Sequence, residues 1–108
     1  MVLIFGGTYQ GKLDYATERF GNGKIINELD KWILELVKEE ADVEEAVLRF
    51  IDENPNAVVI CNDISCGIVP VDPIIRKWRE AVGRTLAALS QKSDEVVRLF
   101  CGIPTRIK

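Results

Sequence analysis

Residues 6–12 read GGTYQGK and fit the spacing G-x-x-x-x-G-K of a phosphate-binding loop. In such a loop the glycines let successive backbone N–H groups face an anion, and the lysine reaches the outer phosphates. The next position normally carries Ser or Thr, whose hydroxyl holds magnesium, but here it is Leu13. The predicted phosphate- or nucleotide-binding residues are therefore Gly6, Gly7, Thr8, Tyr9, Gln10, Gly11 and Lys12.

An alternative interpretation of this stretch is a glycine-rich turn between a strand and a helix, with a lysine on the surface. The flanking sequence favours the phosphate loop, because the apolar run VLIF at residues 2–5 precedes the glycines and a helical pattern follows them. A helix that begins at the loop would add positive potential and free N–H donors. We favour the phosphate loop and keep the turn as the alternative.

Several other chemistries are excluded by composition. The chain has no histidine, which rules out Ser-His and Cys-His pairs and phosphohistidine chemistry. Its three cysteines are an odd number, which argues against a disulfide framework, and zinc lacks ligands. Cys61 and Cys66 are too far apart for a C-x-x-C redox pair. We expect Cys61 and Cys101, which lie in apolar runs, to be small core residues.

Charge and length bound the class of protein. The 108 residues carry a net charge of −3, with 47% apolar and 29% charged residues, as expected for one globular domain over residues 1–108. A negative chain argues against a nucleic-acid partner. No apolar run reaches the roughly 20 residues that span a bilayer, so we predict no membrane contact and a cytoplasmic location.

One basic cluster stands out against this acidic background. Its members are Arg76, Lys77, Arg79 and Arg84. The plain interpretation is a solvated helix face. The functional alternative is a patch that binds phosphate or an acidic partner.

The elements that must position the loop follow from the apolar pattern. Three short apolar runs predict buried strands at residues 2–5, 57–61 and 95–101, and residues 102–108 are expected to be a short tail. Between the loop and Gly21, a first helix should turn Leu13, Ala16 and Phe20 toward the core.

Capping signals mark two further helices. Asp42 and Glu45 form a capping box for a helix over residues 43–54. Asp72 followed by Pro73 predicts the start of another helix, which should run to about Ser90.

Strands that alternate with helices predict an α/β fold with a small, mainly parallel sheet flanked by helices. The carboxyl ends of parallel strands meet at one edge of a sheet, and ligands bind there. We therefore expect Asn62 and Asp63, which follow the strand 57–61, to lie close to residues 6–12.

Residues 62–108 resemble the C-terminal half of the bifunctional adenosylcobinamide kinase / adenosylcobinamide-phosphate guanylyltransferase family of cobalamin biosynthesis. The family pattern runs Asn-Glu-Val-Gly-x-Gly-Ile-Val-Pro, then Arg-Asp-x-x-Gly-Arg, then Ala-Asp-x-Val and a strand ending Ser-Gly-Ile. The matching residues are Asn62, Asp63, Gly67, Ile68, Val69, Pro70, Arg79, Gly83, Arg84, Asp94, Val96, Gly102 and Ile103. The resemblance implies a three-layer sandwich of the P-loop NTPase type that binds ATP or GTP, and a corrinoid as a further ligand.

The middle of the chain departs from this family. The family carries a second strand and a histidine-bearing segment after the first helix, and the histidine that receives the guanylyl group has no counterpart here. The family's next strand ends in Asp-Cys-Leu-Thr-x-Trp, where the acid serves magnesium. In this chain Trp32 matches the tryptophan, Asn27 replaces the acid, and the neighbouring Glu28 is an imperfect substitute.

This alignment leaves residues 24–27 with two interpretations. The helical spacing of apolar residues in KIINELDKWILELVKEE favours one continuous helix. The alignment instead makes 24–27 a short strand that precedes a shorter helix. Both interpretations remain open from the sequence.

Three functions also remain open. The first is a degenerate family member that retains a phosphate- or nucleotide-binding loop. The second is an active ATP- or GTP-dependent cobinamide kinase without guanylyl transfer, with Lys12, Asp63 and Glu28 as catalytic candidates and Asp63 or Glu28 holding magnesium. The third is a non-catalytic structural or regulatory protein. We expect a homo-oligomer, because the family forms oligomers and a shortened sheet leaves exposed edges.

Overall fold

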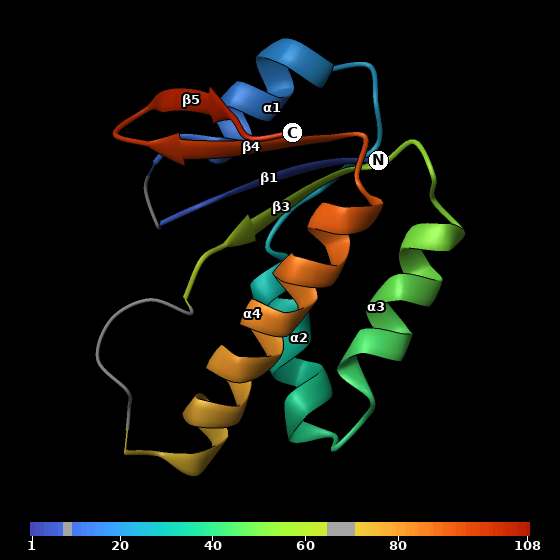
Figure 1. Cartoon of the computed structure of the whole chain (residues 1–108), viewed down its shortest axis with the longest axis vertical. Coiled ribbons are helices and arrows are strands. Elements are labelled where there is room, and N and C mark those ends of the chain that lie inside the picture. Colours follow the sequence, from blue (N-terminus) through green and yellow to red (C-terminus); the bar gives the residue numbers. More distant parts are fainter. Residues whose placement is uncertain (8–9, 65–70) are drawn as a thin grey trace.

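The computed structural model describes residues 1–7, 10–64 and 71–108. A central sheet has one helix on one face and three helices on the other (Figure 1). In chain order the elements are β1 (Val2–Gly6), α1 (Lys12–Phe20), β2 (Ile25–Ile26), α2 (Leu29–Lys38), α3 (Val43–Asp52), β3 (Val58–Asn62), α4 (Pro73–Lys92), β4 (Glu95–Phe100) and β5 (Ile103–Arg106). The predicted α/β three-layer sandwich is confirmed.

The strand order in the sheet is β2-β3-β1-β4-β5. The first four of these strands are parallel, and β5 runs antiparallel to β4. The three predicted strands are all present in this sheet. The expectation of a tail after residue 101 was wrong, because the left-handed residues Cys101 and Gly102, with φ of 53° and 74°, close a hairpin that returns the chain along β4.

Alternation along β1 divides the core between the two faces. Leu3 faces the layer of α2, α3 and α4, and its neighbour Ile4 faces α1. Both side chains are fully buried, and burial of one such side chain stabilises the fold by roughly 1.5–3 kcal/mol. The larger cluster lies on the three-helix side, which is therefore the thicker part of the core.

Two apolar side chains expected in the core are exposed. Leu13 is 46% exposed, and the side of α1 that packs against the sheet carries the buried Ala16 with the partly buried Tyr15 and Phe20. Cys101 is exposed at the tip of the β4–β5 hairpin. Cys61, in the middle of the sheet, is buried as expected.

Residues 24–27 are not part of one continuous helix. Ile25 and Ile26 pair in parallel with Val58 and Val59 of β3. The backbone of Glu28 then adopts the left-handed conformation, with φ of 60°, and α2 starts at the next residue. The strand implied by the family alignment is therefore correct.

Both predicted helix caps are present. The Asp42 side chain accepts a hydrogen bond of 3.1 Å from the backbone N–H of Glu45. The Asp72 side chain accepts from the N–H groups of Ile74 and Ile75, at 2.8 and 3.4 Å. Helix α4 ends at Lys92, slightly beyond the predicted end.

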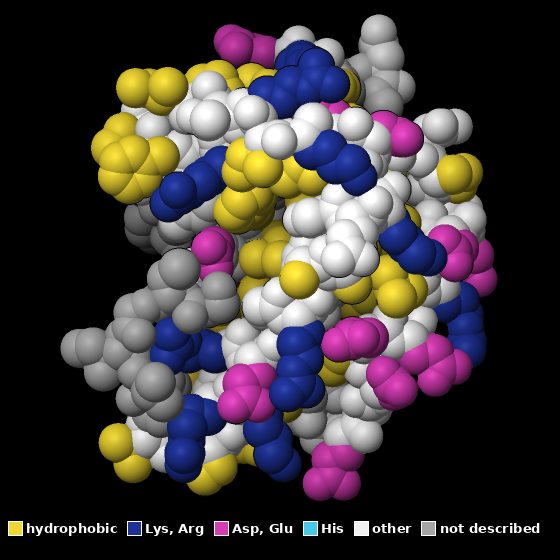
Figure 2. Space-filling model, in the orientation of Figure 1, with side chains coloured by type: hydrophobic (Ala, Val, Ile, Leu, Met, Phe, Trp, Pro, Cys, Tyr) yellow, Lys and Arg dark blue, Asp and Glu magenta, His cyan; other side chains and the backbone are white. Residues whose placement is uncertain are grey.

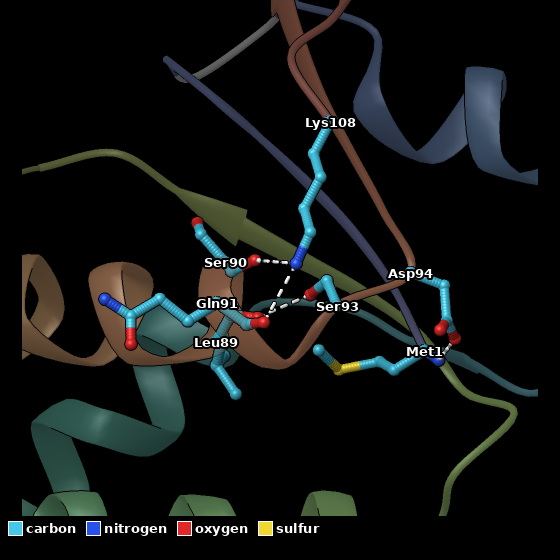
Figure 3. Close-up of polar contacts among 7 residues, drawn as sticks. All are labelled: Met1, Leu89, Ser90, Gln91, Ser93, Asp94 and Lys108. Atoms are coloured by element: carbon cyan, nitrogen blue, oxygen red, sulfur yellow. Dashed lines mark hydrogen bonds and ion pairs between the residues drawn. The ribbon is translucent and has the colours of Figure 1, made fainter.

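Contacts from both ends of the chain gather at the end of α4 (Figure 3). The Lys108 ammonium donates to the carbonyl oxygens of Ser90 and Gln91, at 3.1 and 2.8 Å. A cation at this position satisfies carbonyl groups that the helix leaves free and interacts favourably with its dipole. The amino group of Met1 pairs with Asp94 at 2.7 Å, which fixes the start of β1 beside the start of β4.

The face of the sheet over β4 and β5 is incompletely covered. Phe100, Ile103 and Ile107 are 63%, 65% and 57% exposed. Figure 2 shows hydrophobic side chains on the surface at this end of the molecule, with basic side chains between them. Among the helices that the structure describes, none contains an apolar stretch of the length that a bilayer span requires.

Candidate functional site

A cavity of about 230 Å³ lies at the carboxyl-terminal edge of the sheet. It is bounded by the start of α1, the segment between β2 and α2, and the end of β3. The lining residues are Gln10, Gly11, Lys12, Leu13, Asp14, Asn27, Glu28 and Asn62. Its position matches the edge at which open α/β sheets bind ligands.

The register of β1 and β3 brings the two predicted segments together, as expected. Gly6 lies opposite Asn62, and the backbone N–H of Asp63 donates to the Gly6 carbonyl oxygen at 2.8 Å. Asn62 lines the cavity, whereas the described part of the lining does not include Asp63.

Gly6 has a structural reason to be glycine. A Cβ atom at this position would collide with the carbonyl oxygen of Leu99 on the adjacent strand β4. This glycine therefore allows the close approach of two strands, and it does not line the cavity. Gly7 also lies outside the lining, while Thr8 and Tyr9 lie outside the described residues.

Gly11 has the features of a ligand-facing glycine. It is the N-cap of α1, with a left-handed φ of 82°, and an added Cβ would have no atom of the described residues within 4 Å apart from its own chain neighbours and helix backbone. Gly11 and the first three residues of α1 line the cavity, so the helix begins at it. Such a helix terminus attracts anions.

Lys12 starts α1 and turns its side chain inward. The residue is only 7% exposed, and its ammonium donates a hydrogen bond of 2.5 Å to the Gly7 carbonyl oxygen. Burial lowers the pKa of Lys12 below its ordinary value, and the negative charge of Asp30 opposes this shift. An ammonium has three donors, so this side chain can bind its own loop and a ligand oxygen together.

Asp30 is a site residue that we did not identify from the sequence. It is 3% exposed, at the start of α2. Its carboxylate accepts from the backbone N–H and the side-chain amide of Asn62, at 3.1 and 3.3 Å. The sequence did contain an indication of this burial. Asp30 lies three residues before the buried Ile33, on the apolar face of the helix.

Asn27 and Glu28 form the wall of the cavity opposite Lys12. The Asn27 side chain accepts from the backbone N–H of Glu28 at 2.9 Å, and this bond supports the left-handed turn before α2. A non-glycine residue in this conformation is uncommon and is often found at functional sites. Glu28 thus brings a carboxylate to the cavity, and the Lys31 ammonium pairs with this carboxylate at 3.0 Å.

Cys61 does not offer a nucleophile to this site. Burial in the sheet raises the pKa of its thiol far above the ordinary value, and the charges of Asp30 and Asp63 act in the same direction. The thiol therefore stays protonated. This result agrees with the expectation of a structural core residue.

The basic cluster of α4 is divided among separate contacts. Arg79 donates to the Ile64 carbonyl oxygen at 3.0 Å and so holds the segment after β3 against the helix. Lys77 and Arg84 line a different cavity, between α3 and α4, which also contains acidic side chains. Among the described lining of the loop cavity, no residue comes from this cluster.

The site fits magnesium only in part. Within the described ranges, no three His, Cys, Asp or Glu side chains come together as a metal-binding group. Magnesium in proteins is commonly held by one or two carboxylates together with phosphate oxygens and waters. Glu28 could supply a carboxylate, whereas Leu13 has no oxygen to offer. The residues present therefore fit a magnesium ion that arrives with a nucleotide.

Comparison with known proteins identifies one family, and the match includes several residues that line the cavity. A family model described as cobinamide kinase / cobinamide phosphate guanyltransferase matches residues 21–107. The matched region includes Asn27, Glu28, Asp30 and Asn62, while the glycine loop and α1 precede it. No curated protein matches the chain.

Proposed function

The chain belongs to the cobinamide kinase / cobinamide phosphate guanyltransferase family, which relates it to cobalamin metabolism, and we propose that it binds nucleotide phosphates without guanylyl transfer. The observation that carries this proposal is the start of α1. Gly11 begins the helix at the cavity, and Lys12 is buried against the same cavity.

Phosphate binding needs less than phosphoryl transfer. Backbone N–H groups, the helix terminus and Lys12 supply the donors that a bound phosphate requires. Transfer also requires neutralisation of the charge that moves between oxygens, which is chiefly the role of magnesium. Leu13 and Asn27 remove the two metal contacts of the family pattern, so we expect kinase turnover to be lower by orders of magnitude.

The size of the cavity supports a ligand group of limited volume. Its 230 Å³ is below the roughly 300–1,000 Å³ of most small-molecule pockets. We therefore infer that the phosphate chain of ATP or GTP occupies it, with the base and sugar outside. Corrinoid binding, cytoplasmic location and the absence of a nucleic-acid partner remain predictions from family and composition.

One observation favours the active kinase as the second candidate. Glu28 stands one residue after the position of the lost acid and reaches the cavity wall in a left-handed conformation. If this carboxylate takes the metal role, turnover would depend on it. The third alternative, a non-catalytic structural or regulatory protein, predicts an inert loop.

Nucleotide titration tests the proposal. ADP, ATP and GTP are titrated calorimetrically into the parent protein, Lys12→Ala and the control Lys38→Ala, which removes an exposed lysine at the end of α2. We expect Lys12→Ala to weaken binding by about ten- to a hundred-fold, as for loss of a charged hydrogen bond, and Lys38→Ala to have no effect.

Phosphoryl transfer from ATP to cobinamide is measured in parallel. Binding without turnover supports the proposal, and turnover that Glu28→Gln abolishes supports the kinase alternative. If no nucleotide binds to the parent protein, the loop is only a turn.

A further inference from the structure

We propose that Asp30 determines the ligand selectivity of the loop cavity, so that it accepts a phosphate carrying a divalent cation and disfavours the bare anion. This inference rests on the proposed function, because it concerns the same cavity. It does not follow from the family pattern, in which the corresponding position is a threonine.

The first step is the burial of a full negative charge next to the site. Asp30 lies at the start of α2 and is only 3% exposed. The indole N–H of Trp78 fixes its backbone by a 2.8 Å hydrogen bond to the Asp30 carbonyl oxygen. A buried charge is screened by salt much less than a surface charge. Its field therefore acts on the neighbouring cavity.

The second step concerns the orientation of Asn62. An ionised carboxylate only accepts hydrogen bonds, so the Asn62 side chain must present its NH₂ group to Asp30. The 3.3 Å contact between the Asn62 amide nitrogen and the Asp30 carboxylate has this arrangement. The amide oxygen is thereby turned away from Asp30, and no donor among the described residues reaches it. Asn62 therefore turns its amide oxygen, a hydrogen-bond acceptor, away from Asp30, while one of its two side-chain N–H groups is held by the carboxylate.

The third step is the balance of charge around the cavity. The lining contains one ammonium, Lys12, and two carboxylates, Asp14 and Glu28, and the Glu28 carboxylate is paired with the ammonium of Lys31 at 3.0 Å. Asp30 adds a third negative charge behind Asn62. Residues 8–9 and 65–70, which the structure does not describe, carry no charged side chain. With Lys31 counted, these groups carry three negative charges and two positive ones.

These steps lead to one ligand chemistry. A bare pyrophosphate group would meet Lys12 and the α1 terminus, but also the carboxylates of Asp14 and Glu28, with the negative charge of Asp30 behind Asn62. A divalent cation on the phosphate chain would neutralise this repulsion, and its hydration waters are donors that suit the Asn62 oxygen. Asp30 is accordingly a positioning and selectivity residue, because its carboxylate acts through Asn62 and through its charge.

The test measures the affinity for ADP with and without magnesium. The proteins are the parent chain, Asp30→Asn, Asn62→Ala and the control Glu35→Gln, which removes an exposed charge from the same helix. We expect the parent and the control to bind magnesium-ADP at least about ten-fold more tightly than free ADP. Asp30→Asn should reduce this ratio on the order of ten-fold by strengthening binding of free ADP. Asn62→Ala should reduce it less, because the buried charge remains.

A measurement without ligand separates orientation from charge. NMR spectra of the side-chain amides should show a large shift of the Asn62 signals in Asp30→Asn and none in Glu35→Gln. A purely structural role of Asp30 would lower stability in Asp30→Asn and leave the magnesium ratio unchanged, which would overturn the inference. Should Asp30→Asn fail to fold, an unchanged ratio in Asn62→Ala overturns it.

The outcomes distinguish this inference from the proposed function. If neither free ADP nor magnesium-ADP binds to the parent protein, the proposed function fails and this inference fails with it. If both forms bind with equal affinity, nucleotide binding stands and only the selectivity role of Asp30 is rejected.

Discussion

The backbone N–H of Asp63 donates a 2.8 Å hydrogen bond to the carbonyl oxygen of Gly6. This bond joins the segment after β3 to the last residue of β1, where the glycine loop begins. On its other side Gly6 packs against the Leu99 carbonyl of β4. The position of the loop is therefore set by the two strands next to β1.

Alanine substitutions at three glycines should have distinct effects on stability. Gly6→Ala should cost about 3 kcal/mol, because its Cβ meets a backbone oxygen that cannot move away. Gly11→Ala should cost roughly 1–2 kcal/mol, for the left-handed conformation alone. Gly7→Ala, with its nearest contact at 3.8 Å, should stay within about 0.5 kcal/mol of the parent. Urea unfolding measures the order, and equal effects at Gly6 and Gly7 would contradict this account.

Leu13→Ser should restore a hydroxyl at the start of α1 with little loss of stability. Leu13 is 46% exposed, so the change should cost about 1 kcal/mol or less. The hydroxyl should increase the ratio of magnesium-ADP affinity to free-ADP affinity, because it adds an oxygen ligand. Leu13→Ala is the matched control, since it removes the same apolar contacts without adding oxygen. Equal ratios in the two variants would show that this position does not reach the metal.

Nucleotide binding should weaken as alkaline pH removes the charge of Lys12. Its pKa is lowered by burial from the ordinary 10.5, so the ammonium is lost at a lower pH than in the unfolded chain. Because the unfolded chain holds this proton more tightly, the Lys12 contribution to stability rises with pH between its folded pKa and 10.5, while phosphate affinity falls. Calorimetry across this range checks the prediction. Lys12→Arg should keep the charge and abolish the decline.

The protein should form no acid-labile covalent guanylyl intermediate of the kind that the family forms on histidine. The reason is the absence of histidine from the sequence. After incubation with labelled GTP and magnesium, the denatured protein should carry no acid-labile label. A labelled peptide from this chain that loses its label in acid would refute the prediction.

Self-association should use the uncovered sheet face, and the outer edge of β5 should stay unpaired. The backbone N–H of Ile107 donates to the Val96 carbonyl oxygen at 2.8 Å, so the backbone of Ile107 faces β4. Because successive residues of a strand direct their N–H groups to opposite sides, the backbone nitrogen of Pro104 lies on the outer edge of β5. Proline has no N–H, so it weakens that edge as a template for another strand. The exposed apolar residues Phe100 and Ile103 remain as a surface that a second copy could cover.

Sedimentation at micromolar concentration tests this expectation. The parent protein should sediment above its monomer mass of 12.1 kDa, and the double variant Phe100→Ser, Ile103→Ser should return to that mass. Thr105→Pro would not serve as a control, because the Thr105 N–H faces β4 and its loss would disturb the hairpin itself. Arg106→Ala on the outer edge serves instead and should leave the assembly intact. A parent protein that is only monomeric would reject self-association.

Much of the fold was predictable because it depends on local pattern. Short apolar runs form strands in the sheet wherever helices separate them, and Asp42 and Asp72 cap their helices as local rules require. The resemblance also placed β2 correctly, where apolar periodicity alone favoured a helix. The proximity of Asn62 to the glycine loop followed from parallel strands and needed no further information.

The sequence by itself determined which chemistry the chain lacks and which residues could bind phosphate. Only the tertiary structure decided that Gly6 serves strand packing while Gly11 faces the cavity, since the two have the same side chain and differ only in their surroundings. It also decided that Leu13 and Cys101 are exposed and that Asp30 is buried next to Asn62. These properties depend on which other elements cover a residue, and burial in turn sets the strength of each charge. A pattern along one chain does not contain that information.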